Sequence, residues 1–249
     1  MGKETAMRDF CGRLSRWTLV ATLVVLGAGS TGCATNGRQV LLKEYGPTVP
    51  EVASALNGKT ICIKRFECAP SLTAVPPTTP PIEPAGFKFE ELPGAQDKVW
   101  GKELEAAQKS VPKADWREIG NLRNGFGMTL SHVYALNDPG AWLADTLRMD
   151  LEKQGAKVVP PEEAENADVC VSGDIQFCRV DIYMKIWGDL VVELAVTRKG
   201  RDTVKTVLHT EGGTVAWVAS EGEFYKPIRE CRQKFSWLAL QEIAKLVQR

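Results

Sequence analysis

The chain has 249 residues, and its 31 Lys and Arg side chains balance 31 Asp and Glu side chains, so the formal net charge at pH 7 is zero. A nucleic-acid-binding protein usually gathers a basic excess on one face. The composition shows no such excess, and we therefore expect no nucleic acid as a partner. The length suits one domain with a tether, or two small domains.

The first residues have the pattern of an export signal. Four basic side chains precede an apolar run over residues 17–29, and these are Lys3, Arg8, Arg13 and Arg16. The run is too short for a bilayer span, which needs about 20 apolar residues. A short apolar run followed by small residues is typical of a cleaved signal. An ordinary secretory signal, a lipoprotein signal and an uncleaved anchor all stay open on this pattern alone.

Residues 30–33, with the sequence STGC, resemble the lipobox of bacterial lipoproteins, in which the cysteine becomes the lipidated first residue of the mature chain. Ser30 departs from the pattern, because an aliphatic residue is usual there. The resemblance implies a signal peptide over 1–32, lipidation of Cys33, and a lipidated N-terminus and tether over 33–58. Ala34, after the cysteine, implies sorting to the outer membrane of a Gram-negative bacterium, facing the periplasm.

Five cysteines would remain after export into an oxidising compartment, and these are Cys62, Cys68, Cys170, Cys178 and Cys231. An odd number leaves at least one thiol free or bonded to another chain. Cysteines six or eight residues apart in one extended strand are about 20 Å or more apart, too far for a disulfide bond. Bridges between neighbouring strands stay open. We interpret the five as buried small apolar side chains, and with no C-x-x-C spacing we predict no metal site and no cofactor.

The N-terminal half is expected to contain one strand and a proline-rich segment. Residues 59–69 predict a strand with an irregularity near Arg65. Residues 70–86 contain five closely spaced prolines within 76–84, which favour an extended polyproline conformation and predict a spacer. Residues 87–115 predict a linker with a helical segment over 98–110.

Residues 116–249 predict the main domain. A strand over 116–124 is followed by an irregular loop over 125–138. A helix then begins at Pro139 behind the N-cap Asp138 and ends at Gly155. The leucine spacing at 143, 147 and 151 makes this helix amphipathic.

The rest of this domain predicts a β-meander and a final helix. The meander covers residues 167–219, with a tight turn at Lys199-Gly200 and with Ile175 and Phe177 on the same face. The last element opens with a capping-box pattern, SEGE over 220–223, and Pro227 implies that the regular helix begins near it or is kinked there. This order of elements predicts an α+β fold, a two-layer domain in which a β-meander sheet is covered on one face by two amphipathic helices.

The domain over 116–249 resembles an uncharacterised family of bacterial lipoproteins, similar to the YajG-type lipoproteins and to the auxiliary lipoproteins of envelope ABC transport systems. The resemblance rests on three segments, which read AWLADTLRMDLEKQGAKVV over 141–159, ADVCVSGDIQFCRVDIYMKIWGDLVVELAVTRKG over 167–200 and HTEGGTVAWVAS over 209–220. It covers about half of the chain. The family has no established catalytic residues, so the resemblance implies location and fold and carries over no catalytic residue.

Several residues could suggest cofactor binding or catalysis, but ordinary structural roles in loops and strands explain them better. Gly125 and Gly127 lack the third glycine of a dinucleotide loop, because Leu130 stands at its position. The neighbours Ser131 and His132 are a nucleophile type and a base type, but adjacent residues rarely face each other productively, and a hydrolase triad also needs a third orienting group and an oxyanion site. Acidic side chains along the meander are expected on its solvent face, and these are Asp174, Asp181, Asp189 and Glu193.

Two groups of side chains are candidate contact sites. Phe126 and Met128 form a candidate binding loop, and Tyr183, Trp187 and Trp217 form a candidate binding platform. We therefore predict a non-catalytic, lipid-anchored envelope lipoprotein that acts as an adaptor or accessory to an envelope complex. Its expected partners are the membrane, through the anchor, and another envelope protein. The alternatives are a periplasmic lipid- or glycan-binding component of envelope transport and, with less support, a hydrolase.

Overall fold

The computed structural model describes residues 37–42, 53–74, 76–89, 94–214 and 221–248. The predicted signal peptide, the tether residue Cys33 and the platform residue Trp217 lie outside these ranges. Residues Arg38–Arg249 make up one compact unit of the chain. Within the described residues, no helix combines the length and the apolar character that a membrane crossing requires.

The described residues form one sheet of eight strands together with several helices. The strands are β1 (Arg38–Val40), β2 (Thr60–Cys68), β3 (Arg117–Arg123), β4 (Thr129–Ala135), β5 (Lys157–Val159), β6 (Val169–Tyr183), β7 (Lys185–Arg198) and β8 (Thr203–Thr214). The helices are α2 (Ala53–Leu56), α3 (Gly94–Ser110), α4 (Pro139–Lys153) and α5 (Glu221–Gln248), with short 3₁₀ turns η1 (Lys113–Asp115) and η2 (Pro161–Asn166).

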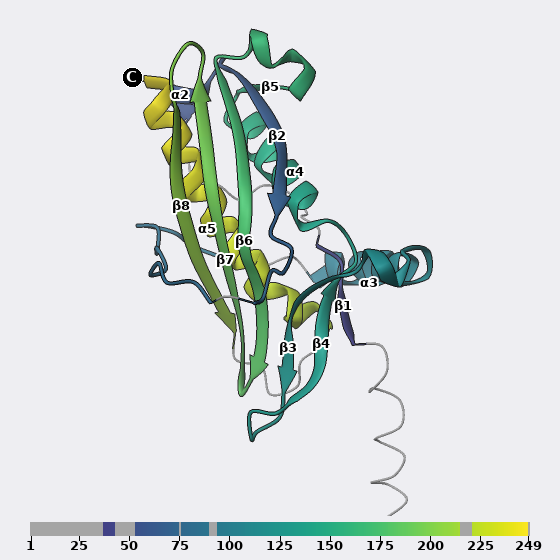
Figure 1. Cartoon of the computed structure of the whole chain (residues 1–249). Helices are drawn as coiled ribbons and strands as arrows, with labels where there is room; N and C mark the ends of the chain where they lie inside the picture. Colours follow the sequence, from purple (N-terminus) through teal and green to yellow (C-terminus); the bar gives the residue numbers. More distant parts are fainter. Residues whose placement is uncertain (1–36, 43–52, 75, 90–93, 215–220, 249) are drawn as a thin grey trace, which may run out of the picture. The chain divides into compact units, whose positions relative to one another are not determined.

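Strand β6 organises the sheet. One of its edges pairs along its whole length with β7, which pairs in turn with β8, so these three strands form the predicted antiparallel meander. Its other edge carries two separate groups of strands, as Figure 1 shows. Parallel β2 pairs with the first half of β6 and continues to β5. Parallel β3 pairs with the last residues of β6 and continues to β4 and β1.

A bulge divides β6 between Ile175 and Phe177. One extra residue moves every later side chain to the other face of the sheet. Ile175 and Cys178 therefore both belong to the main core, whereas Phe177 lies beside Val191 on the opposite face. The prediction that Phe177 shares the face of Ile175 is wrong for this reason. We call the face on which Phe177 lies the outer face.

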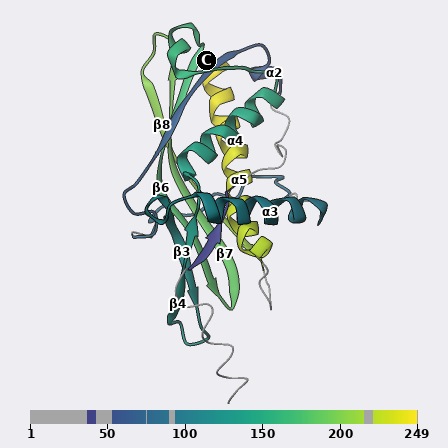
Figure 2. The same ribbon diagram turned by 90° about the vertical axis from the view of Figure 1, so that its right-hand side faces the viewer.

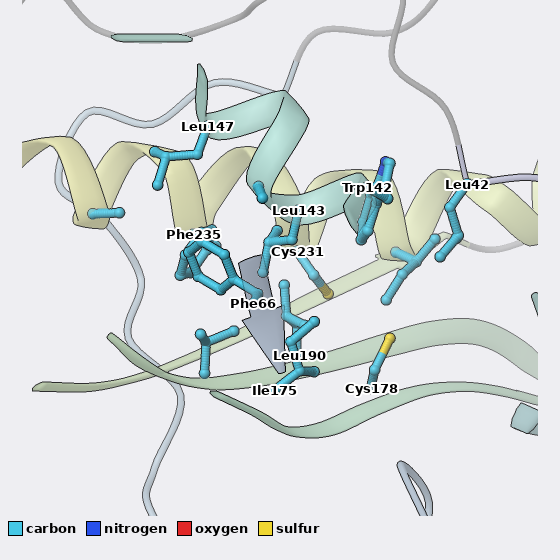
Figure 3. Close-up of a cluster of buried hydrophobic side chains, with 14 of the residues drawn as sticks. Leu42, Phe66, Trp142, Leu143, Leu147, Ile175, Cys178, Leu190, Cys231 and Phe235 are labelled. Carbon is cyan, nitrogen blue, oxygen red and sulfur yellow. The ribbon is translucent and has the colours of Figure 1, made fainter. Parts of the chain in front are cut away.

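Helices α4 and α5 pack on one face of the sheet, as Figure 2 shows. The core beneath them centres on Phe66 of β2, whose ring meets that of Phe235 of α5 edge to face with the centroids 6.1 Å apart. Leu143 and Leu147 of α4 complete this layer (Figure 3). The arrangement confirms the predicted two-layer α+β domain with a sheet covered by two amphipathic helices.

One segment of the main domain differs from the prediction. Residues Thr129–Ala135 form strand β4 where we expected an irregular loop, because β1 and β3 pair with β4 on either side. Helix α5 begins at Glu221 and includes Pro227. Pro227 is the seventh residue of the helix and has no N–H, so the regular hydrogen bond to the backbone carbonyl of residue 223 is missing there.

The proline-rich residues, which we expected to act as a spacer, lie against the sheet. The N–H of Cys178 donates to the carbonyl of Leu72 at 2.9 Å, and the N–H of Ile82 donates to the carbonyl of His209 at 2.8 Å. Further on, the ring of Phe87 meets that of Trp237 of α5 edge to face. The segment thus runs from β6 to the free edge of β8 and on to α5. We call residues 76–89 the strap.

Side chains of α5 bond the same free edge of β8. Lys234 Nζ donates to the carbonyl of Glu211 at 2.9 Å, and Glu230 Oε2 accepts from the N–H of Gly213 at 3.0 Å. The strap and α5 therefore cover the β8 edge at residues 209, 211 and 213.

The N-cap of α4 agrees with the sequence pattern and allows a direct test. Asp138 Oδ1 accepts from the N–H of Gly140 at 2.8 Å, and Arg65 pairs with Oδ2 of the same carboxylate. We expect Asp138→Ala to lower the free energy of unfolding by about 1 kcal/mol. Urea denaturation at neutral pH measures this change.

Asp145→Ala on the same helix removes only an exposed ion pair with Arg148 and serves as the control. Equal losses in the two variants would contradict a role of Asp138 as a cap.

Candidate functional site

Two turns lie side by side at one end of the sheet, and they bring the candidate binding loop next to the end of the meander. Tyr183 Oη, at the end of β6, donates to the carbonyl of Gly125 in the β3–β4 turn at 3.3 Å. The guanidinium of Arg123 lies over the Tyr183 ring, 5.2 Å from its centroid. Figure 1 shows both turns at the lower end of the sheet.

This end carries the four most exposed large apolar side chains of the described residues. Their exposed fractions are 89% for Phe126, 83% for Met184, 60% for Met128 and 58% for Leu130. Elsewhere in the described residues no large apolar side chain is more than 43% exposed. We call these four residues the apolar tip.

The backbone of the tip is held in place by local hydrogen bonds. Asn124 Oδ1 accepts from the N–H groups of both Phe126 and Met128, each at 3.0 Å. Gly127 between them has φ +82°, a conformation that glycine adopts readily. Met184 turns the chain between β6 and β7 with φ +58°, which is uncommon for a residue with a side chain. The tip therefore presents three of its apolar side chains from these two turns and the fourth, Leu130, from the start of β4.

A buried ion-pair network supports the tip from the outer face. Asp181 of β6 is fully buried and accepts from both Arg123 and Arg179. The expectation that Asp181 faces solvent is therefore wrong, because the two arginines cover it. The network ties β3 to β6 directly below the two turns and fixes their relative position.

The candidate platform is only partly an open aromatic surface. Tyr183 and Trp187 lie on the same face, because Trp187 pairs in register with Asp181, two residues before Tyr183. A cation covers each ring: Arg123 lies over Tyr183, and Lys185 lies over Trp187, with its Nζ 4.7 Å from the ring centroid. These rings are therefore engaged by the protein's own side chains.

The five described cysteines are all free thiols. Cys62 of β2 and Cys170 of β6 are neighbours in register on adjacent strands. Cys68 lies six residues after Cys62 on β2, and Cys178 lies eight residues after Cys170 on β6. Burial raises the pKa of Cys62 to about 11, and the adjacent Cys170 thiol contributes to this rise. Burial likewise raises the pKa of Cys178 to about 12. Thiols with such pKa values are weak nucleophiles at neutral pH.

The neighbours Ser131 and His132 do not form a nucleophile and base. Ser131 Oγ donates to the backbone carbonyl of His132 at 3.4 Å, and His132 Nδ1 lies 3.0 Å from Glu118 Oε1 on β3. The imidazole thus faces a carboxylate across the strand pair and not the hydroxyl. This geometry lacks the hydrogen bond that would activate the serine.

A polar cluster on the outer face was not predicted from the sequence. His209 and Glu211 are two residues apart on β8, and Asp189 of β7 pairs in register with Glu211. One ligand-type atom from each side chain lies within 4.8 Å of the other two. Burial raises the pKa of Asp189, the charge of Glu211 raises it further, and His209 partly offsets this rise. The sequence could have indicated only that His209 and Glu211 share a strand face, because they are two residues apart. Asp189 joins them through the register of β7 and β8.

Comparisons with known proteins find several solved structures, all with low sequence identity and low TM-scores. No model of a known protein family matches the chain, and no curated protein matches it. A crystal structure of a DUF330 protein from Xanthomonas campestris has a TM-score of 0.47 at 10% identity, covering 82% of this chain and 96% of that one. A structure of an uncharacterised protein has a TM-score of 0.44 at 9% identity, with coverages of 86% and 99%.

A hypothetical protein from Chlamydia trachomatis has a TM-score of 0.31 at 7% identity, covering 76% of this chain and 98% of that one. At these values none of the three structures carries an inference about function. Inferences about function therefore rest on the residues of this chain.

Proposed function

We propose that the protein is a non-catalytic accessory of an envelope complex, anchored by a lipid on Cys33 and docked to a partner protein through its apolar tip. The observation that carries this proposal is the exposure of Phe126, Met184, Met128 and Leu130 at one end of the sheet. Large apolar side chains gathered on a surface mark interaction sites in soluble domains. An aromatic ring on an ordered turn, such as Phe126, is a suitable anchor for a partner's pocket.

The anchoring part of the proposal rests on the sequence. The lipobox-like STGC at 30–33 and the resemblance to YajG-type and ABC-transport auxiliary lipoproteins support an outer-membrane lipoprotein that faces the periplasm. Stable anchoring needs more than one acyl chain, which this kind of modification supplies.

An adaptor is better supported than a glycan-binding component. A glycan platform needs open aromatic faces, whereas Arg123 and Lys185 cover the rings of Tyr183 and Trp187. The apolar tip has no comparable cover, because its side chains are more than half exposed.

Site-specific crosslinking in intact cells tests the docking surface. We expect a photoreactive residue in place of Phe126 or Met184 to capture one defined protein. The same residue in place of Val204 is the control, because Val204 is 43% exposed and lies near the β7–β8 turn, remote from the tip along β7. Lipid adducts alone from positions 126 and 184, or adducts that are equal at all three positions, would contradict a protein partner at the tip.

Two further variants separate docking from folding and from anchoring. Phe126→Asp should reduce recovery of the captured protein at least about tenfold, since truncating an interface anchor costs about 2 kcal/mol or more. Its free energy of unfolding should change by less than about 0.5 kcal/mol, because the side chain is exposed. Cys33→Ser shows whether the association also needs the anchor.

A further inference from the structure

We propose that Asp189, His209 and Glu211 form a binding site for one divalent transition-metal cation of the Zn²⁺ type. The three side chains project from the outer face of β7 and β8, and none of them belongs to the apolar tip. The site is therefore independent of the proposed docking function. It is defined by the register of the two strands and by the strap.

The histidine is the strongest indication of a ligand. His209 is 3% exposed, and its Nδ1 lies 2.6 Å from the carbonyl of Thr79 in the strap. A carbonyl only accepts hydrogen bonds, so Nδ1 must carry a proton. In the neutral imidazole, Nε2 then has its lone pair free to bind a metal, and an Nδ1–H donated to a carbonyl is the usual support of a metal-bound histidine.

His209 Nε2 is buried and has no hydrogen-bond partner among the described residues. It points toward Asp189, with 3.6 Å between Nε2 and Oδ1, which is too long for a hydrogen bond. A lone pair and a carboxylate oxygen facing each other repel unless a cation or a proton lies between them. The geometry thus favours a positive group at this point.

The two carboxylates strengthen the same conclusion. Asp189 and Glu211 face each other in register across β7 and β8, so their like charges raise the free energy of the folded state. Three cations lie nearby, and each has another partner. Arg179, opposite Asp189 in register, pairs with Asp181, and Lys234 pairs with Glu83 and Glu230. Lys185 lines the same cavity as the two carboxylates and lies over the Trp187 ring. A bound divalent cation would neutralise both carboxylates at once.

The donor set selects the class of metal. One imidazole nitrogen with two carboxylates suits Zn²⁺ and related transition metals, whereas Ca²⁺ and Mg²⁺ prefer sites made of oxygen alone. Three protein ligands leave a fourth position for water or for a ligand from outside. Ligand atoms around tetrahedral zinc are about 3.4 Å apart for bonds of about 2.0–2.1 Å. The present separations of up to 4.8 Å would close by small rotations of the two carboxylate side chains.

Zinc titration of the chelator-treated, full-length protein tests the site. We expect one Zn²⁺ to bind per wild-type chain, and the affinity to fall at least about tenfold in Asp189→Asn and in His209→Gln, since each loses a ligand. His132→Gln is the matched control, because His132 also faces a carboxylate, Glu118, but outside the cluster. Zinc should raise the melting temperature of the wild type and of His132→Gln, and not that of Asp189→Asn.

Two spectroscopic measurements keep the proposal testable if a variant misfolds. Co²⁺ in place of Zn²⁺ should give a spectrum without a sulfur-to-metal band, because no cysteine belongs to the site. Nitrogen NMR reports the protonation of Nε2 of His209 in the metal-free protein, and the Nε2 resonance should shift on addition of zinc. Absence of binding in the wild type, equal affinity in all variants, or a doubly protonated His209 paired with Asp189 would each overturn the proposal.

Discussion

Replacing Asp150 with alanine should lower the free energy of unfolding by about 3–5 kcal/mol, because the change removes the carboxylate that neutralises the buried guanidinium of Arg232. Asp150 of α4 and Arg232 of α5 are almost completely buried, and their side chains meet with 2.8 Å between Oδ2 and Nη1. The pair joins the two helices above the sheet. Urea denaturation of wild type and variant measures the loss.

A double variant distinguishes the cost of an unpaired charge from a general need for polar groups. Asp150→Leu combined with Arg232→Met removes both charges and keeps apolar volume between α4 and α5. We expect it to recover most of the stability lost in Asp150→Ala, since apolar replacements of buried pairs are often neutral or stabilising. A double variant as unstable as the sum of its single variants would contradict this explanation.

Phe66→Ala should cost a similar amount, about 3–5 kcal/mol, because it opens a cavity at the centre of the core. The Phe66 ring is completely buried, packs edge to face on Phe235, and lies directly over Gly173 of β6. A methyl group on Gly173 would overlap that ring, which shows how closely the ring and the strand pack. Thermal and urea denaturation measure the loss.

Phe87→Ala is the control for Phe66. Phe87 makes the same kind of edge-to-face contact, with Trp237, but it lies in the strap and is only half-buried. Its loss should therefore be clearly smaller than that of Phe66→Ala. Equal losses would mean that the strap contributes as much to folding as the centre of the core.

Elements with a strong local pattern could be predicted from the sequence. Helix α4 has an aspartate cap, a proline at its first position and leucines spaced by four, all of which depend on neighbouring residues only. The meander of β6, β7 and β8 shows alternating apolar residues joined by the turn at Gly200. In both cases the signal lies within a short window of the chain.

The features that could not be predicted depend on residues far apart in the chain. Strand β4 has only two fully buried residues, Val133 and Ala135, and it is a strand because β1 and β3 flank it. The bulge after Ile175 has no sequence signal of its own. The exposure of the tip was suggested by the Gly-Phe-Gly sequence, but Met184 joins it only because β3 and β6 end together.

The cluster of Asp189, His209 and Glu211 was hidden for the same reason. Only the pairing of β7 with β8 brings Asp189 opposite Glu211, and only the strap places a carbonyl at the back of His209. In the sequence, only His209 and Glu211 are close together, and two candidate ligands alone do not predict a metal site.

The covered edge of β8 has a consequence for how the protein can associate. An open edge strand invites another chain to add a strand, which leads to strand-exchanged oligomers and to aggregation. Ile82 of the strap and two side chains of α5 already bond three outward-facing backbone groups of β8. These groups are the carbonyls of His209 and Glu211 and the N–H of Gly213. Growth of the sheet from this stretch of β8 is therefore blocked, and a partner that approaches here meets side chains instead of open backbone.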